Sequence, residues 1–176
     1  MVPSAAVSQP LWAPWRMEYI LGPKDKSSCV FCVGDSASES ELAERLVVFR
    51  GERTLVMLNR YPFAAGHLLV MPRAHKSELG ELPGADHDLL FRVVRESVAR
   101  LKSAVHCHGV NVGINLGEAA GAGIAEHLHV HVVPRWESDS NFMPVIADKR
   151  IVPQALDDTR KYLLTAFADL SEGSIS

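Results

Sequence analysis

The sequence predicts an α+β domain with a mainly antiparallel sheet, one long helix inserted between strands and a second helix near the C-terminus. Three observations indicate this class. Short apolar runs of strand length are separated by turn residues in the first half of the chain. A longer stretch then repeats apolar side chains every three to four residues, as one face of a helix does. After it, two segments alternate between apolar and other side chains, which is the pattern of half-buried strands.

The first half of the domain is expected to supply three strands. The apolar runs that predict them are Leu46–Phe49, Thr54–Leu58 and His67–Met71. Pro62 and Gly66 mark the segment between the second and third runs as a turn. Residues 34–41, with the sequence GDSASESE, are expected to form a polar loop before the first strand.

The second half is expected to supply the helices and the two alternating strands. Residues 85–104 form the long helix, because their apolar side chains fall on one face. This face consists of Leu89, Leu90, Val93, Val94, Val98 and Leu101. The alternating strands span residues 109–116 and 127–133, and Pro134 ends the second. A loop of small residues, 117–126, joins them, and a final helix spans about residues 154–170, just after Pro153.

One domain is expected at residues 29–170, with an irregular arm at residues 1–28 and a short tail at residues 171–176. A chain of 176 residues, 47% of them hydrophobic, can build one core without disulfides. Three cysteines and a net charge of −3 argue against a disulfide scaffold and a nucleic-acid surface. The sequence shows no signal-peptide pattern and no apolar run of membrane length, so we expect a cytoplasmic protein with no membrane partner.

Three histidines, His127, His129 and His131, alternate with apolar residues, so a strand would carry all three on one face. The intervening leucine and valine have an obvious place against a core. Three imidazoles suit neither a core nor an ordinary solvated face, because each ring has two nitrogens that need partners. Chance, a metal site and a reactive site are the competing interpretations.

Glycines in the preceding loop favour the reactive site. Gly117, Gly121 and Gly123 precede the histidines closely, and glycine lets backbone N–H groups approach an anion. A phosphate held there would meet His129, which has a histidine on either side. A neutral imidazole, whose reference pKa is about 6.5, has a free ring nitrogen that can attack phosphorus. We therefore predict that His129 is a nucleophile, and that the outer histidines orient it and donate to phosphoryl oxygens.

Two further candidates, Cys29 and Cys32, have the spacing of a two-thiolate zinc clip. Two ligands are only half a site. A redox pair and a pair of buried cysteines are the alternatives. The redox pair is disfavoured because no βαβ pattern follows Cys32.

Together these motifs resemble the histidine-triad (HIT) superfamily, whose signature alternates histidines with apolar residues. The similarity covers roughly residues 11–165. The segments that carry it are Leu11–Arg16, Asn59–Pro72, Asn111–Gly117, Ala120–Ile124, His127–Val133, Pro134–Trp136 and Asn141–Phe142. The first and the last two of these segments are similar to a bacterial branch that includes diadenosine tetraphosphate phosphorylases.

This resemblance implies a HIT-like fold with a five-stranded antiparallel sheet, paired into a homodimer or into a tetramer of such dimers. It implies a nucleotide substrate that is cleaved at the α-phosphorus through a nucleotidyl-histidine intermediate on His129. His131 and His67 are implied to support His129 and to contact phosphate oxygens, and Asn59 to bind the ribose. The other residues implied to hold the α-phosphate are Asn115, Gly121, Ala122 and Gly123.

The same resemblance implies a metal site. Some superfamily members complete a two-cysteine clip with two histidines. One of them follows the histidine of the Gly-His pair by eight residues, as His75 follows His67, and the other is the first of the triad, His127. The implied site is therefore a closed, structural Zn²⁺ site made of Cys29, Cys32, His75 and His127. Mg²⁺ is expected only as a companion of the polyphosphate substrate.

The function expected from this resemblance is cleavage of a dinucleoside polyphosphate such as diadenosine tetraphosphate. The acceptor is either phosphate or water. Some phosphorylase relatives have a hydroxyl residue near Gly123 that could help to hold the incoming phosphate, and Gly123 has none, so water stays an alternative to phosphate. Hydrolysis of adenosine phosphoramidates or aminoacyl-adenylates is one alternative, although Trp136 and the C-terminal segment differ from that branch. A zinc-stabilised nucleotide sensor without turnover is the other alternative.

Overall fold

The computed structural model of the protein describes residues 29–137, 139 and 156–175. The predicted N-terminal arm lies outside the described residues. So do the Leu11–Arg16 and Asn141–Phe142 motifs and the first residues of the predicted final helix.

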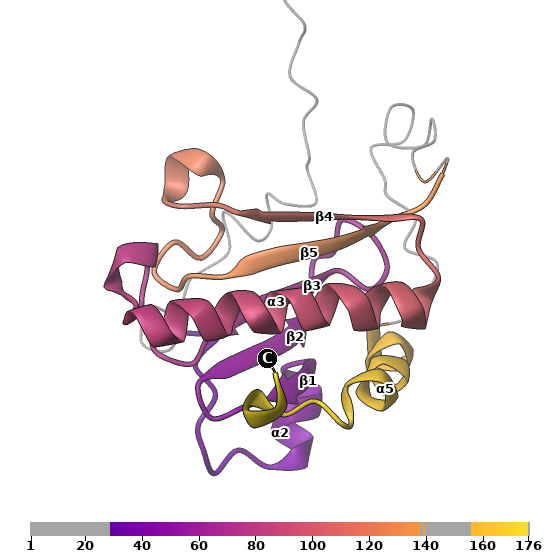
Figure 1. Cartoon of the computed structure of the whole chain (residues 1–176), viewed down its shortest axis with the longest axis horizontal. Coiled ribbons are helices and arrows are strands. Elements are labelled where there is room, and N and C mark those ends of the chain that lie inside the picture. Colours follow the sequence, from indigo (N-terminus) through magenta and orange to yellow (C-terminus); the bar gives the residue numbers. More distant parts are fainter. Residues whose placement is uncertain (1–28, 138, 140–155, 176) are drawn as a thin grey trace, which may run out of the picture.

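Five strands form a single antiparallel sheet in the order β1–β2–β3–β5–β4 (Figure 1). The strands are β1 at Val47–Arg50, β2 at Thr54–Leu58, β3 at Leu68–Pro72, β4 at Gly109–Ile114 and β5 at Val130–Arg135. Each neighbouring pair is antiparallel, which confirms the predicted α+β class and sheet type.

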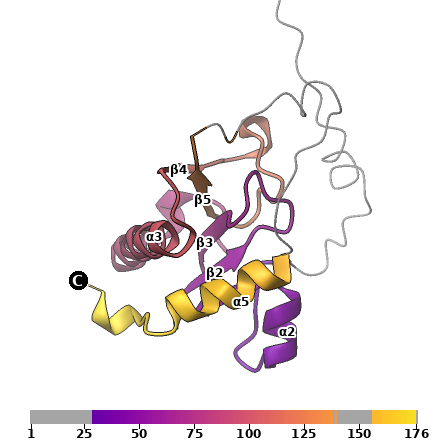
Figure 2. The ribbon, with the colours of Figure 1, turned by 90° about the vertical axis from the view of Figure 1, so that its right-hand side faces the viewer.

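Three α-helices accompany the sheet in the described part of the chain: α2 at Glu39–Glu44, α3 at Gly84–Val105 and α5 at Leu156–Phe167. The long helix α3 packs across one face of the sheet (Figure 2). Helix α5 packs against α3 and β1. Short 3-10 turns lie at Leu79–Glu81, Glu118–Ala120 and Glu172–Ser174. Among these described residues, no helix is both long and apolar enough to span a membrane.

Helix α2 is absent from the prediction, because its first residues fall in the predicted polar loop at residues 34–41. The side chain of Ser38 accepts a hydrogen bond from the backbone N–H of Glu41, which caps the first turn. Leu42 is the buried residue that anchors the helix to the rest of the domain. A single apolar anchor produces no visible periodicity, so the cap was the only signal available in the sequence.

The last strand differs from its predicted bounds at both ends. It begins at Val130 rather than at His127, and it continues through Pro134 to Arg135. Its pairing with β3 covers only Val130 to Val132, so among the described strands Pro134 has β4 as its single partner. A proline lacks the N–H that a ladder on both sides would need, but it is tolerated beside a single neighbouring strand.

Alternation along the strands sends apolar side chains to two separate cores. On one face, Val56, Val70 and Val130 belong to the large cluster beneath α3 and α5. On the other face, Leu55 and Leu69 belong to a smaller cluster. This second cluster is completed by Phe31, Val33 and Leu42, so the segment around the two cysteines covers the face that α3 leaves open.

Residues 171–175, the described part of the predicted C-terminal tail, pack against the domain. Ile175 is 8% exposed within the large core. The Glu172 carboxylate accepts backbone N–H bonds from Glu52, Arg53 and Thr54 at 2.8–3.2 Å, and it accepts the Thr54 hydroxyl as well. A side chain at Gly51 would collide with this carboxylate, since an added Cβ would lie 2.1 Å from its oxygen.

Replacing Glu172 by glutamine is expected to lower the free energy of unfolding by about 2 kcal/mol, because an uncharged amide accepts these hydrogen bonds more weakly than the carboxylate does. Equilibrium denaturation in urea measures the change. Glu52→Gln is the matched control, because it also removes one negative charge at the β1–β2 turn but keeps the Glu52 backbone N–H that donates to Glu172. Equal stability of the Glu172→Gln variant and the parent would show that this carboxylate does not hold the C-terminal segment.

Candidate active site and metal site

The histidine segment lies on the face of the sheet opposite α3. Leu128 and Val130 point into the core beneath α3, and each is at most 2% exposed. The histidines therefore point toward the smaller cluster, where the rings of His127 and His129 lie 5.7 and 5.0 Å from the Phe31 ring. Although this part precedes β5, the Leu128 N–H donates to the Lys76 carbonyl at 2.6 Å, which holds it in place.

The environment of His129 determines which of its ring nitrogens is reactive. Nδ1 lies 2.7 Å from the backbone carbonyl oxygen of His127. A carbonyl can only accept, so Nδ1 carries the proton and Nε2 keeps a lone pair. Burial lowers the pKa of His129, which keeps the imidazole neutral at neutral pH. The ring is thus a neutral base or nucleophile with a defined reactive atom.

A second chain of contacts determines where the His131 proton lies. The Phe63 N–H donates to His67 Nδ1 at 3.1 Å, so the proton of His67 lies on its Nε2. That Nε2 lies 3.0 Å from His131 Nδ1, which must then accept. The remaining nitrogen of His131, Nε2, carries its proton and is a donor. His67 is fully buried and its ring stacks on Phe63, with centroids 4.9 Å apart, so the arrangement is rigid.

A cavity of about 650 Å³ opens beside His129 and His131. Three other predicted residues line it: Asn59, Gly121 and Gly123. His67 lies behind His131 rather than on the cavity wall. Asn115 and Ala122 are not among the lining residues, and the Ala122 N–H donates to the Gly117 carbonyl at 3.3 Å.

The loop conformation depends on two glycines. Gly117 and Gly121 have φ of 76° and 85° around the 3-10 turn at Glu118–Ala120, a region that glycine adopts without strain. This turn folds the loop back on itself, so only part of it reaches the cavity.

Several cavity residues were missed in the sequence. They come from the cysteine segment, from α2 and its end, and from β2 with the turn that follows it. These residues are Val30, Phe31, Glu41, Glu44, Arg45, Met57, Leu58, Arg60 and Tyr61. The only available signal was an aromatic residue between two closely spaced cysteines, because the rest reach the cavity only through tertiary packing.

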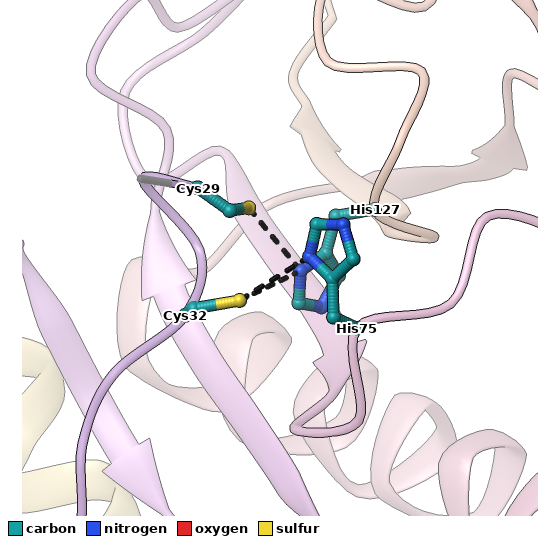
Figure 3. Close-up of side chains that lie close together, drawn as sticks. All are labelled: Cys29, Cys32, His75 and His127. Atoms are coloured by element: carbon teal, nitrogen blue, oxygen red, sulfur yellow. Dashed lines mark hydrogen bonds between the residues drawn. The ribbon is translucent and has the colours of Figure 1, made fainter. Parts of the chain in front are cut away.

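The four predicted metal ligands lie together beside the histidine segment (Figure 3). Their ligand atoms are all within 4.8 Å of one another. Cys29 Sγ lies 3.4 Å and Cys32 Sγ 3.7 Å from His127 Nδ1, and Cys32 Sγ lies 3.3 Å from His75 Nδ1. A tetrahedral zinc ion separates its sulfur and nitrogen ligands by about 3.6 Å, so the spacing fits.

The hydrogen bonding of His127 also suits metal ligation. Its Nε2 lies 2.9 Å from the Pro72 carbonyl and donates to it, which leaves the Nδ1 lone pair directed toward the two sulfur atoms. Desolvation, assisted by the neighbouring Cys29, raises the pKa of the Cys32 thiol to about 11. A bound cation would reverse that effect by stabilising the thiolate. The four residues can therefore hold a metal ion.

Comparisons with known proteins agree with this geometry. A sequence model of the HIT domain family matches residues 41–138. The AP-4-A phosphorylase of Mycobacterium tuberculosis is 40% identical over 165 residues, which cover 91% of this chain and 85% of that protein.

Two solved structures share the fold. One is a hypothetical histidine triad nucleotide-binding protein from Sulfolobus tokodaii strain7, with 26% identity, a TM-score of 0.62, and coverage of 81% of this chain and 93% of that one. The other is a Zn-bound histidine triad family protein from Mycobacterium smegmatis, with 26% identity, a TM-score of 0.60, and coverage of 80% and 94%. With the sequence match, the fold and the paired histidine and cysteine clusters all in agreement, this chain belongs to the HIT domain family.

Proposed function

We propose that this protein cleaves dinucleoside polyphosphates, with diadenosine tetraphosphate as the substrate, by nucleotidyl transfer through His129. The observation that carries the proposal is the 2.7 Å contact between His129 Nδ1 and the His127 carbonyl, which leaves Nε2 as the nucleophile at the cavity wall. The name of the relative that is 40% identical supports the choice of substrate.

The reaction proceeds in two displacements. The Nε2 lone pair of His129 attacks the α-phosphorus, and the bond from that phosphorus to its bridging oxygen breaks to release ATP. An acceptor oxygen then attacks the adenylylated histidine, and the P–N bond breaks to regenerate the neutral ring. The His131 Nε2–H stabilises the negative charge that builds up on the phosphoryl oxygens in both steps.

Other cavity residues position the substrate. Asn59 lies next to His67, with its side-chain nitrogen 3.4 Å from His67 Nδ1, and we assign it to the ribose hydroxyls. Gly121 and Gly123 are assigned to the α-phosphate because they line the cavity beside the histidines. Asn115 and Ala122 take no part in this proposal, since neither of them lines the cavity.

We propose inorganic phosphate as the acceptor, which the name of the 40% identical phosphorylase supports, and product analysis tests it. Diadenosine tetraphosphate is incubated with the protein, with and without phosphate, and the nucleotides are separated. The expected products are ADP and ATP, and they form only with phosphate. AMP and ATP in both samples would instead identify water as the acceptor. No cleavage in either sample would contradict the proposed function.

Loss of the His67 donor is expected to lower kcat by on the order of 10²-fold, because His131 would no longer be held with its proton on Nε2. His67→Leu tests this, since leucine fills a similar volume but cannot donate. His67→Gln can still donate an N–H to His131 Nδ1 and is expected to retain more activity. Steady-state kinetics on both variants decide the question, and equal losses in the two would show that His67 only fills space.

The metal held by the four ligands is proposed to be zinc in a structural role. Two thiolates and two imidazoles form a closed tetrahedral set, which is typical of structural zinc sites. The Zn-bound relative supports this choice. Zinc would stabilise the two thiolates and fasten the cysteine segment to His127.

A homodimer is proposed to form through β4. Within the described part of the chain, β4 pairs with β5 on one side and has no partner strand on the other, and Val112 on it is 49% exposed. The open edge of a sheet offers backbone N–H and C=O groups that can pair with the same strand of a second copy. Light scattering is expected to give twice the mass of the chain, and Val112→Lys is expected to favour the monomer.

A further inference from the structure

Phe31 lies between the two cysteines of the metal clip, and the clip determines its backbone path. Its N–H donates to Cys29 Sγ at 3.4 Å, and the Cys32 N–H donates to the Cys29 carbonyl at 3.1 Å. These bonds wrap the segment tightly around the first sulfur atom. Any ion that draws the two sulfur atoms toward His127 therefore also determines where the Phe31 side chain lies.

The same side chain forms part of the nucleotide cavity. Phe31 is 7% exposed, it lines the cavity, and its ring centroid lies 5.0 Å from that of His129. The ring also meets His127 edge-on at 5.7 Å. One aromatic ring thus touches both a metal ligand and the proposed nucleophile, and it borders the space where a nucleotide would lie.

Other contacts hold this segment without the metal, so loss of the ion would loosen it rather than unfold the domain. Arg45 donates to the carbonyls of Val30 and Cys32 at 3.1 and 3.5 Å, and Arg73 donates to the Val33 carbonyl at 3.2 Å. Val33 is 8% exposed in the same small core, but it does not line the cavity. Val33 therefore anchors the segment without touching a nucleotide.

We propose that Phe31 is a positioning residue that couples the metal clip to the nucleotide cavity, so that metal and nucleotide each bind more tightly when the other is present. The inference rests on the proposed function, since it requires a nucleotide in this cavity. Linkage makes the coupling reciprocal, so the factor by which zinc improves nucleotide binding equals the factor by which the nucleotide improves zinc binding.

The experiment measures binding rather than turnover. AMP is titrated calorimetrically into full-length protein, first loaded with zinc and then stripped of it by a chelator, with circular dichroism to confirm folding. Zinc affinity is measured separately by competition with a chromophoric chelator, with and without saturating AMP. We expect AMP to bind about tenfold tighter to the zinc-loaded protein, and AMP to raise zinc affinity by the same factor.

Two variants test the role of the ring. Phe31→Ala is expected to reduce to near one both the factor by which zinc improves AMP binding and the factor by which AMP improves zinc binding. Val33→Ala loosens the same segment away from the cavity and is expected to retain both factors. Equal AMP affinity with and without zinc in the parent would overturn the coupling but leave the proposed function standing. Equal loss of coupling in both variants would overturn the role of Phe31. If AMP fails to bind the zinc-loaded parent, the proposed function itself fails, and the coupling with it.

Discussion

His129→Ala is expected to reduce kcat by about 10⁴-fold or more, because the variant has no atom that can form the covalent bond to the α-phosphorus. The loss should fall on kcat rather than on the affinity for the nucleotide, since most of the cavity wall is unchanged. Single-turnover experiments with labelled diadenosine tetraphosphate provide the direct measurement. Acid-labile label should appear on the parent protein and be absent from the variant.

A second histidine serves as the control for this substitution. His87 lies on α3, which packs on the opposite face of the sheet from the cavity, and His87→Ala should leave both kcat and labelling unchanged. Retained turnover in a folded His129→Ala variant would refute the nucleophile assignment. Label that persists on that variant would place the covalent bond on a different residue.

Cys29→Ser is expected to abolish stable zinc binding and to lower the thermal stability of the protein. Serine lacks the thiolate, so the ligand set falls from four to three. With free zinc at about 100 times the Kd of the parent site, the lost binding energy is about 2.7 kcal/mol. In a chain of this length this corresponds to a decrease in Tm of roughly 5–10 °C. Elemental analysis and differential scanning calorimetry, performed with and without zinc, measure the two effects.

The third cysteine of the chain provides a matched control. Cys107 is buried away from the metal ligands, so Cys107→Ala should keep its zinc and its response to added zinc. The decisive quantity is the increase in Tm that zinc produces, because a cavity left by the substitution lowers Tm with or without the metal. A Cys29→Ser variant that gains as much from zinc as the parent does would remove Cys29 from the ligand set.

Much of the fold follows from local patterns. Helix α3 and strand β2 lie within a residue of their predicted positions, because a long amphipathic helix and a short apolar run each carry a strong local signal. The features that the prediction lacked, helix α2 and the exact bounds of β5, carry weak local signals. Helix α2 has one buried anchor. Strand β5 continues through Pro134 because β4, and not β3, pairs with it at that position.

The sequence by itself determined the chemistry that can occur here. Alternation sends three histidines to one side of their segment, and the cysteine spacing with the family resemblance indicated a four-ligand metal site. Only the tertiary structure decided which nitrogen of each histidine carries the proton, because that depends on carbonyl and N–H groups supplied by distant residues. Only the tertiary structure, likewise, places the Phe31 ring beside His129 and the Glu172 carboxylate at the β1–β2 turn. Such contacts join residues far apart in the chain, and no local periodicity encodes them.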